Sequence, residues 1–190
     1  MFSAVVNSAV VLAAVTFMAS GCNSGSPTQP QPATPREVSG TITFANAGPA
    51  NAPLSSHSES GFVVQLRSPT WEVWTGYGNP APFPVFFSRG TGVTGEIQIT
   101  AGGEVFSFKS VDLYSSTTPI PFVIVGTRAA GKEIEFGDTL PAAGVVGNTF
   151  GAFRTVRNPS TGRLVDTLTL TLINPCCDNP MGLDNIVLGR

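Results

Sequence analysis

The segment Arg163–Arg190, RLVDTLTLTLINPCCDNPMGLDNIVLGR, is the stretch that decides the fold. Over most of Leu164–Ile173 leucine alternates with threonine, which is the two-residue period of a strand with one buried face. Leu183–Leu188 follows turn-forming residues and predicts a second core strand. The loop between the two strands, Asn174–Gly182, holds two adjacent cysteines. We therefore expect two core strands joined by an unusual loop.

The composition favours short strands over long helices. The 190 residues include 21 glycines and 16 prolines, which interrupt helices, and 13 phenylalanines, which supply core volume. Only 12% of the residues are charged and the formal net charge is −2. Because no basic surface is available for a phosphate backbone, nucleic acid is not an expected partner.

Short apolar stretches alternate with turn signals between residues 38 and 188. The predicted strands are Val38–Ala45, Glu59–Leu66, Val85–Phe87, Gly95–Thr100, Glu104–Tyr114, Ile120–Thr127, Lys132–Phe136, Thr149–Val156, Leu164–Ile173 and Leu183–Leu188. About ten short strands with no helical period predict an all-β fold, an antiparallel β-sandwich.

The first residues have a different character. Phe2–Gly21 carries no charged side chain, and it has the length of a signal-peptide core but is short for a membrane-spanning helix. It ends in Met18-Ala19-Ser20-Gly21-Cys22, which resembles a bacterial lipobox, and this resemblance implies lipidation of Cys22. The alternatives are a cleaved secretory signal and an uncleaved anchor helix. The expected organisation is a lipoprotein signal peptide (1–21), a lipidated cysteine with a Pro-rich disordered linker (22–37) and a β-sandwich domain (38–190).

The lipobox resemblance also implies a location. Several acyl chains on Cys22 would hold the protein permanently at a membrane. Asn23 follows, and by resemblance to enterobacterial lipoproteins a residue other than Asp there permits transfer to the outer membrane. We therefore expect a bacterial cell-envelope protein, lipid-anchored at the outer membrane and facing the periplasm or the surface.

A succession of short motifs resembles a known type of domain. The motifs are Glu59-x-Gly61-Phe62, Gly102–Phe108, Ser110–Leu113, Val123–Gly126 and Leu183–Leu188, in this order. Their order and spacing resemble the jelly-roll domains of secreted bacterial proteins, including exported PEP-CTERM proteins, which are similar to galactose-binding-like and carbohydrate-binding modules. The resemblance implies a jelly roll over residues 38–188 and carbohydrate as the ligand.

Few residues suggest catalysis. His57 is the one histidine in the sequence, and it lies in a polar stretch predicted as a loop with no adjacent nucleophile motif. The sequence contains no HExxH motif, P-loop or dinucleotide glycine motif. Carboxylate pairs for glycoside hydrolysis could be drawn from Glu59, Glu72, Glu104, Asp112 or Asp184, with nothing to rank any pair. We expect a protein that is not an enzyme.

Glu59 and Asp184 are the candidate metal ligands. In the sugar-binding jelly rolls that the chain resembles, a Ca²⁺ ion often sits where an early strand meets the last one, and the resemblance implies oxygen ligands at these two positions. The residues themselves favour another role for Asp184, which is to cap a turn or accept bonds from backbone N–H groups. Structural calcium is the one cofactor that the resemblance suggests.

Trp71, Trp74 and Tyr77 lie in a stretch rich in glycine and proline. On a strand, the spacing of the two tryptophans would place them on opposite faces, whereas in a loop both could stack on sugar faces. The favoured interpretation is that one or both fill the end of the sandwich, because aromatic side chains dominate cores. The alternative is a ligand platform.

Cys176 and Cys177 are neighbours in the chain. Thiols outside the cytoplasm tend to oxidise, and if Cys22 is lipidated these two have only each other within the chain. They could close a strained vicinal disulfide, a rigid apolar patch on which a sugar could rest. The alternatives are a bridge to another copy and two inert thiols. A zinc site is not expected, because zinc needs more nitrogen or sulfur ligands.

Together these patterns predict a non-catalytic, lipid-anchored binding module for carbohydrate. The alternatives are a structural or adhesive surface protein that binds envelope protein partners, and a hydrolase. The first function predicts a groove beside exposed aromatic side chains or the cysteine ring. The second predicts a flat apolar patch without a groove, and the third predicts converging carboxylates in a cleft.

Overall fold

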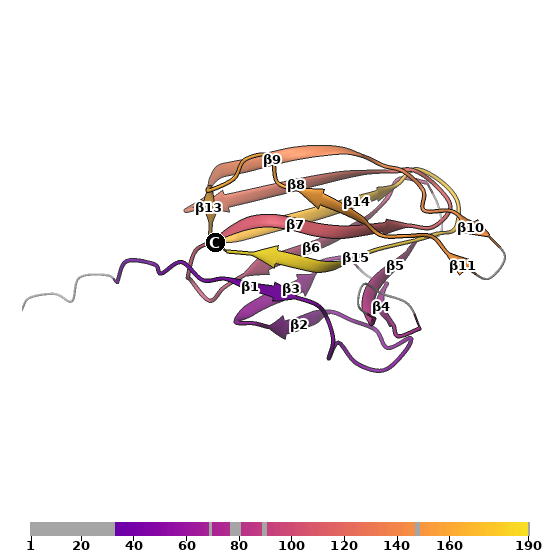
Figure 1. The fold of residues 1–190 in the computed structure, drawn as a ribbon, viewed down its shortest axis with the longest axis horizontal. Coiled ribbons are helices and arrows are strands. Elements are labelled where there is room, and N and C mark those ends of the chain that lie inside the picture. The colour runs from indigo at the N-terminus through magenta and orange to yellow at the C-terminus, as the bar shows by residue number, and fades with distance from the viewer. Residues whose placement is uncertain (1–32, 69, 77–80, 89–90, 147–148, 190) are drawn as a thin grey trace, which may run out of the picture. The chain divides into compact units, whose positions relative to one another are not determined.

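Two antiparallel β-sheets lie face to face in the computed structural model, which describes residues 33–68, 70–76, 81–88, 91–146 and 149–189. Figure 1 shows most of their strands running roughly along one common axis. No helix occurs in these residues, so the prediction of an all-β antiparallel sandwich is confirmed. No helix suited to crossing a membrane is therefore found in the described ranges. The predicted signal peptide, Cys22 and most of the linker lie outside the described residues.

The larger sheet has seven strands. Its order is β12-β7-β15-β5-β4, with β1 paired to β15 and β13 paired to β7, and all pairings are antiparallel. The strands are β1 (Gly40–Ile42), β4 (Trp71–Trp74), β5 (Phe83–Ser88), β7 (Phe106–Ser115), β12 (Arg154–Arg157), β13 (Leu164–Val165) and β15 (Asn179–Leu188).

The smaller sheet has six strands in the order β2-β3-β6-β14-β8-β9, again all antiparallel. The strands are β2 (Ser56–Glu59), β3 (Phe62–Leu66), β6 (Val93–Thr100), β8 (Ile120–Arg128), β9 (Gly131–Leu140) and β14 (Thr167–Asn174). A separate hairpin is formed by β10 (Val145–Val146) and β11 (Thr149–Phe150).

Strand β14 lies in the middle of the smaller sheet, as its alternating sequence suggests. Leu168, Leu170 and Leu172 are buried, while the threonines between them are half-buried on the outer face. Leu170 pairs with Ile97 on β6 and with Ile124 on β8. The three strands therefore present one continuous apolar row to the core.

Strand β15 contains a bulge that explains its imperfect alternation. The pairing of β15 with β7 shifts register between Asp184 and Val187, and Asn185 has φ 48°. Because the bulge adds a residue on one strand, Leu183 and Ile186 both reach the core although they are three positions apart. The prediction of a core strand here is confirmed.

The predicted strand Glu59–Leu66 is two strands in the structure. Ser60 and Gly61 have φ 54° and 84°, and they connect β2 to β3 with Glu59 paired to Phe62. Two consecutive residues with positive φ form the tight turn that matches the twist of a hairpin. The stretch around His57, predicted as a loop, is therefore the strand β2. Such splitting, together with strands of two to four residues, raises the number from about ten to the fifteen described.

The main core fills the space between the sheets, and a second apolar cluster lies outside it. In the second cluster Phe83, Val85 and Tyr114 are buried, and Trp74 and Phe153 pack against them. Alternation places Phe83 and Val85 on the face of β5 opposite Phe86, which belongs to the main core. The larger sheet therefore buries apolar side chains on both faces near β5.

Candidate binding groove

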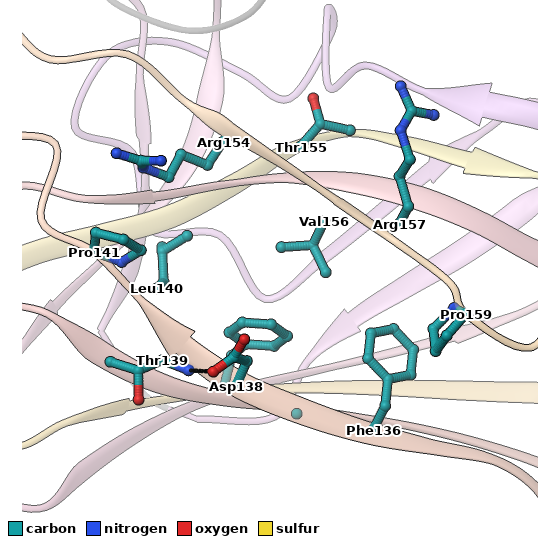
Figure 2. Close-up of a pocket in the computed structure, with 12 residues that line it drawn as sticks. Phe136, Asp138, Thr139, Leu140, Pro141, Arg154, Thr155, Val156, Arg157 and Pro159 are labelled. Carbon is teal, nitrogen blue, oxygen red and sulfur yellow. Dashed lines mark hydrogen bonds between the residues drawn. The ribbon is translucent and has the colours of Figure 1, made fainter.

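A groove of about 480 Å³ lies between β9 and β12. These are edge strands of different sheets: β9 pairs with β8, and β12 pairs with β7. The lining residues come from both edges (Figure 2), and Phe122 on β8 adds to the lining. The sandwich is therefore open to a ligand along this side.

The floor of the groove is apolar and firmly packed. Phe122 and Leu140 are buried at its base. Phe136 is half-buried, and its ring stacks on Phe108 with the ring centroids 6.3 Å apart and the planes inclined by 22°. Val156 also packs against the main core from the other wall. These contacts place an aromatic ring at the groove and pack it against the core.

Polar side chains form the rim of the groove. Asp138 and Thr139 are exposed on β9, and the Thr139 N–H donates to Asp138 Oδ1 at 2.7 Å (Figure 2). Arg154 is exposed on β12. The three ion pairs found among the described residues involve neither Asp138 nor Arg154. A carboxylate and a guanidinium group are therefore both available to a ligand.

The register of β12 decides which of its side chains face the groove. Val156 pairs with the core residue Val111, and Arg154 lies two positions earlier on the same face. Thr155 and Arg157 alternate to the other face. Figure 2 shows Val156 pointing toward Phe136 and Arg157 pointing away from it. Both arginines line the groove, but Arg154 lies on the same face of β12 as Val156, which makes it the arginine directed toward the apolar floor.

Side-chain bonds hold β12 against β7. The Thr155 hydroxyl donates to Asp112 Oδ1 at 2.5 Å. Just beyond the strand, the buried side chain of Asn158 donates to the carbonyl of Phe108 at 2.9 Å, and its backbone N–H donates to the carbonyl of Lys109 at 2.9 Å. This wall of the groove is therefore positioned before any ligand arrives.

The tryptophans lie elsewhere, on opposite faces of β4. Trp71 is only 2% exposed and packs in the main core, with its ring 5.3 Å from that of Phe86. Trp74 is half-buried in the second cluster, and its Nε1–H donates to Glu72 Oε1 at 3.1 Å. Trp71 is therefore a core residue and not a ligand platform. Tyr77 lies outside the described residues.

Glu59 joins β2 to the chain that follows β1. Its carboxylate accepts hydrogen bonds from the N–H groups of Thr43 and Phe44, at 2.9 and 2.8 Å, and from the Thr43 hydroxyl at 2.7 Å. The Nε2 atom of buried His57 lies 3.1 Å from Glu59 Oε2. Burial raises the pKa of Glu59, but the hydrogen bonds from Thr43, His57 and Phe44 outweigh it and hold the pKa below its usual value.

Asp184 is fully buried at the bulge in β15. Its Oδ1 accepts a hydrogen bond from the N–H of Asn185 at 2.7 Å, and its cross-strand partner is Asp112. The sequence favours this role for Asp184, in which the carboxylate accepts a hydrogen bond from a backbone N–H group. The described residues contain no group of three or more His, Cys, Asp or Glu side chains that could hold a metal ion. A calcium site at Glu59 and Asp184 stays a prediction.

Cys176 and Cys177 occupy the turn between β14 and β15. Both are free thiols, and the Cys177 thiol donates to Cys176 Sγ with the sulfurs 2.6 Å apart. The Asn174 side-chain amide donates to the Cys177 carbonyl at 2.7 Å. The hydrogen bond with Cys176 raises the pKa of Cys177.

A second cavity, of about 500 Å³, lies beside the segment that leads into β1. It is lined by Arg36, Ser39, Ser60 and Glu104, among others. Glu104 already accepts a hydrogen bond from the backbone N–H of Arg36. One charged group of this cavity is therefore already engaged by the chain itself, which makes the cavity a weaker candidate for ligand binding than the groove.

None of the groove residues was predicted as a site. Phe136 and Val156 end predicted strands, and their apolar character indicated only burial. Arg154 and Arg157 are two cations within four residues of a chain that is only 12% charged, which is the one signal available. No pattern in the sequence shows that β9 and β12 lie opposite each other.

Comparison with known proteins finds fold likeness at low similarity. No family model and no curated protein matches the chain. Solved structures that match include a family 61 carbohydrate-binding module in complex with β-1,4-galactotriose, with 11% identity over 78% of this chain and 94% of that chain and a TM-score of 0.43. The K1 cleaved adhesin domain of Lys-gingipain from Porphyromonas gingivalis W83 has 11% identity over 80% and 98%, with a TM-score of 0.45.

A third match is the Clostridium thermocellum endo-1,4-β-D-xylanase 10B fragment complexed with xylohexaose, with 13% identity over 79% of this chain and 28% of that chain and a TM-score of 0.40. These similarities are too low to carry an inference about function.

Proposed function

We propose that the protein is a non-catalytic binding module and that the groove between β9 and β12 binds carbohydrate. One observation carries the proposal: an apolar floor with an aromatic ring packed on the core lies beside a guanidinium and a carboxylate that take part in no ion pair among the described residues. The volume of about 480 Å³ is within the range of small-molecule pockets.

The groove offers a partner both for the apolar C–H face of a sugar and for its polar hydroxyl groups. The C–H face of a pyranose is apolar and packs on an aromatic ring, for which Phe136 is the candidate. Sugar hydroxyls both donate and accept hydrogen bonds. Asp138 can accept from them, Arg154 can only donate to them, and Thr139 can do either.

The alternatives find less support in the described residues. Val63, at 37%, is the only large hydrophobic side chain recorded there as exposed, so an adhesive apolar patch is not visible in those residues. The groove is lined by one carboxylate, Asp138, whereas glycoside hydrolysis by the usual mechanism requires two. A binding role needs neither feature.

The groove variants Arg154→Ala and Asp138→Asn test the proposal. A glycan array probed with the purified protein should give hits, and for the best glycan Arg154→Ala should weaken the Kd about 10-fold to 100-fold because a charge-assisted hydrogen bond is lost. Asp138→Asn should also weaken binding. Titration calorimetry with the soluble oligosaccharide measures both effects.

Arg128→Ala is the matched control, because Arg128 is an exposed arginine on β8 that does not line the groove. It should bind like the unaltered protein. An array without hits, or equal binding by Arg154→Ala and Arg128→Ala, would show that the groove does not bind carbohydrate.

A further inference from the structure

We propose that Cys176 and Cys177 form an oxidation site that closes into a vicinal disulfide. The proposal is independent of the groove, which neither cysteine lines. It rests on the geometry of the turn between β14 and β15 and on the contact between the two thiols.

The backbone of the turn brings two adjacent side chains to one side. Neighbouring residues in an extended strand point to opposite faces, so their sulfurs stay apart. Here Cys177 has φ 66°, a left-handed conformation that is uncommon outside glycine and that turns the chain between the two residues. The two sulfurs are therefore in direct contact in the folded turn, which is the first requirement for an S–S bond.

Fixed neighbours hold this turn in place. The buried Asn174 donates to the Cys177 carbonyl at 2.7 Å, and the Asn174 carbonyl accepts from the Gly92 N–H at 2.8 Å. After the turn, the buried Asn179 accepts a hydrogen bond from the Thr117 N–H at 2.9 Å. Both ends of the turn are therefore tied to neighbouring loops, and the thiols are kept together.

The thiols are also accessible. Cys177 is exposed and Cys176 is half-buried, so a small oxidant in solution can reach the pair. Each residue is the other's contact, and no other cysteine lies in the described residues.

The reaction is a thiol–disulfide exchange with a small disulfide RSSR, such as oxidised glutathione. One cysteine, as its thiolate, attacks one sulfur of RSSR, which breaks the S–S bond of RSSR and releases one RS⁻ while the Cys–S–S–R mixed disulfide forms. The second thiolate attacks the protein sulfur of the mixed disulfide and expels the other RS⁻. The Cys176–Cys177 bond forms, the two cysteines lose two electrons to RSSR, and their two protons end on two RSH molecules.

Peptide mapping of the full chain tests the proposal. Trypsin releases both cysteines in the peptide 164–190, which excludes Cys22, because no Lys or Arg lies between residues 163 and 190. After oxidised glutathione treatment and alkylation with iodoacetamide under denaturing conditions, this peptide should carry no alkyl group and be about two mass units lighter than the dithiol, as disulfide formation requires. After reduction it should take up two alkyl groups.

The folded turn should close the ring faster than the same chain unfolded in urea. Cys176→Ser and Cys177→Ser should each keep a glutathione adduct, since no second thiol is present to expel it. A peptide that stays a dithiol, keeps glutathione, or appears linked to a second copy would overturn the proposal. Equal rates in the folded and unfolded chain would also overturn it, because the turn would then have no part in closure.

Discussion

Glu59, a candidate metal ligand by its sequence, connects two segments of the fold through hydrogen bonds. It accepts hydrogen bonds from two backbone N–H groups and one hydroxyl beyond β1, and it also contacts His57. Its side chain is 22% exposed, so water competes only in part. These bonds tie β2 to the segment after β1.

The variant Glu59→Gln should lower the free energy of unfolding by about 2 kcal/mol at neutral pH, because charge-assisted hydrogen bonds are lost and an amide N–H₂ faces backbone N–H donors. Urea denaturation followed by circular dichroism measures the change. Glu135→Gln is the control, because Glu135 is an exposed partner of Lys132 and such pairs contribute little.

The contribution of Glu59 to the free energy of unfolding should also depend on pH. Because the folded-state pKa of Glu59 lies below the unfolded value of about 4.3, its contribution is fully present above that pH and is lost as pH falls through the folded pKa. The stability gap between the unaltered protein and Glu59→Gln should therefore shrink below about pH 4. A gap that stays constant down to pH 2 would show that the charge on Glu59 has no role.

Strand β15 is the element on which the larger sheet depends. It pairs with β7 on one side and with β5 and β1 on the other. Gly182 permits the close approach of β5, since a Cβ there would lie 2.4 Å from the carbonyl oxygen of Pro84. At the bulge, Asn185 takes a left-handed conformation, and its side chain donates to Asp112 Oδ2 at 3.2 Å.

Asn185→Val should destabilise the fold more than Asn185→Gly. Both variants lose the bond to Asp112, but a β-branched residue at φ 48° adds strain of roughly 1–2 kcal/mol, whereas glycine adopts this conformation readily. Thermal unfolding of the two variants gives the comparison. If the valine variant is as stable as the glycine variant, the bulge does not depend on the left-handed residue.

At the scale of the whole molecule, the proposed binding rests on the groove as the main surface feature of the described residues. The charged residues are few, and the described residues show no large exposed apolar patch. The groove lies where the edges of the two sheets leave the sandwich open, which neither sheet could provide alone. We propose that this module is held at the bacterial envelope by a lipid on Cys22, on the basis of the apolar segment and the lipobox-like sequence before it.

Metabolic labelling tests the anchor. Cells that express the full chain should incorporate radiolabelled palmitate into the protein, and Cys22→Ser should abolish the label and release the protein from the membrane fraction, since several acyl chains make attachment permanent. Cys176→Ser is the matched control and should remain labelled. A label that persists in Cys22→Ser would rule out this anchor.

The sequence by itself determined the fold class and the faces of its regular strands. In β14 the period of two selects Leu168, Leu170 and Leu172 for the core, because apolar side chains must leave water together and successive residues of a strand point to opposite faces. The two-residue period did not predict the turn between β2 and β3. The turn is only two residues long, Ser60-Gly61, and the sequence around it therefore predicts one strand, Glu59–Leu66.

Only the tertiary structure decided where a ligand could bind. Phe136 on β9 and Arg154 on β12 meet across a groove because each lies at the edge of a different sheet, and no local pattern records which edges face each other. The tertiary structure also made Trp71 a core residue and turned Cys176 and Cys177 toward each other. Strand periodicity is a local property of the chain, whereas the groove results from contacts between residues distant in sequence.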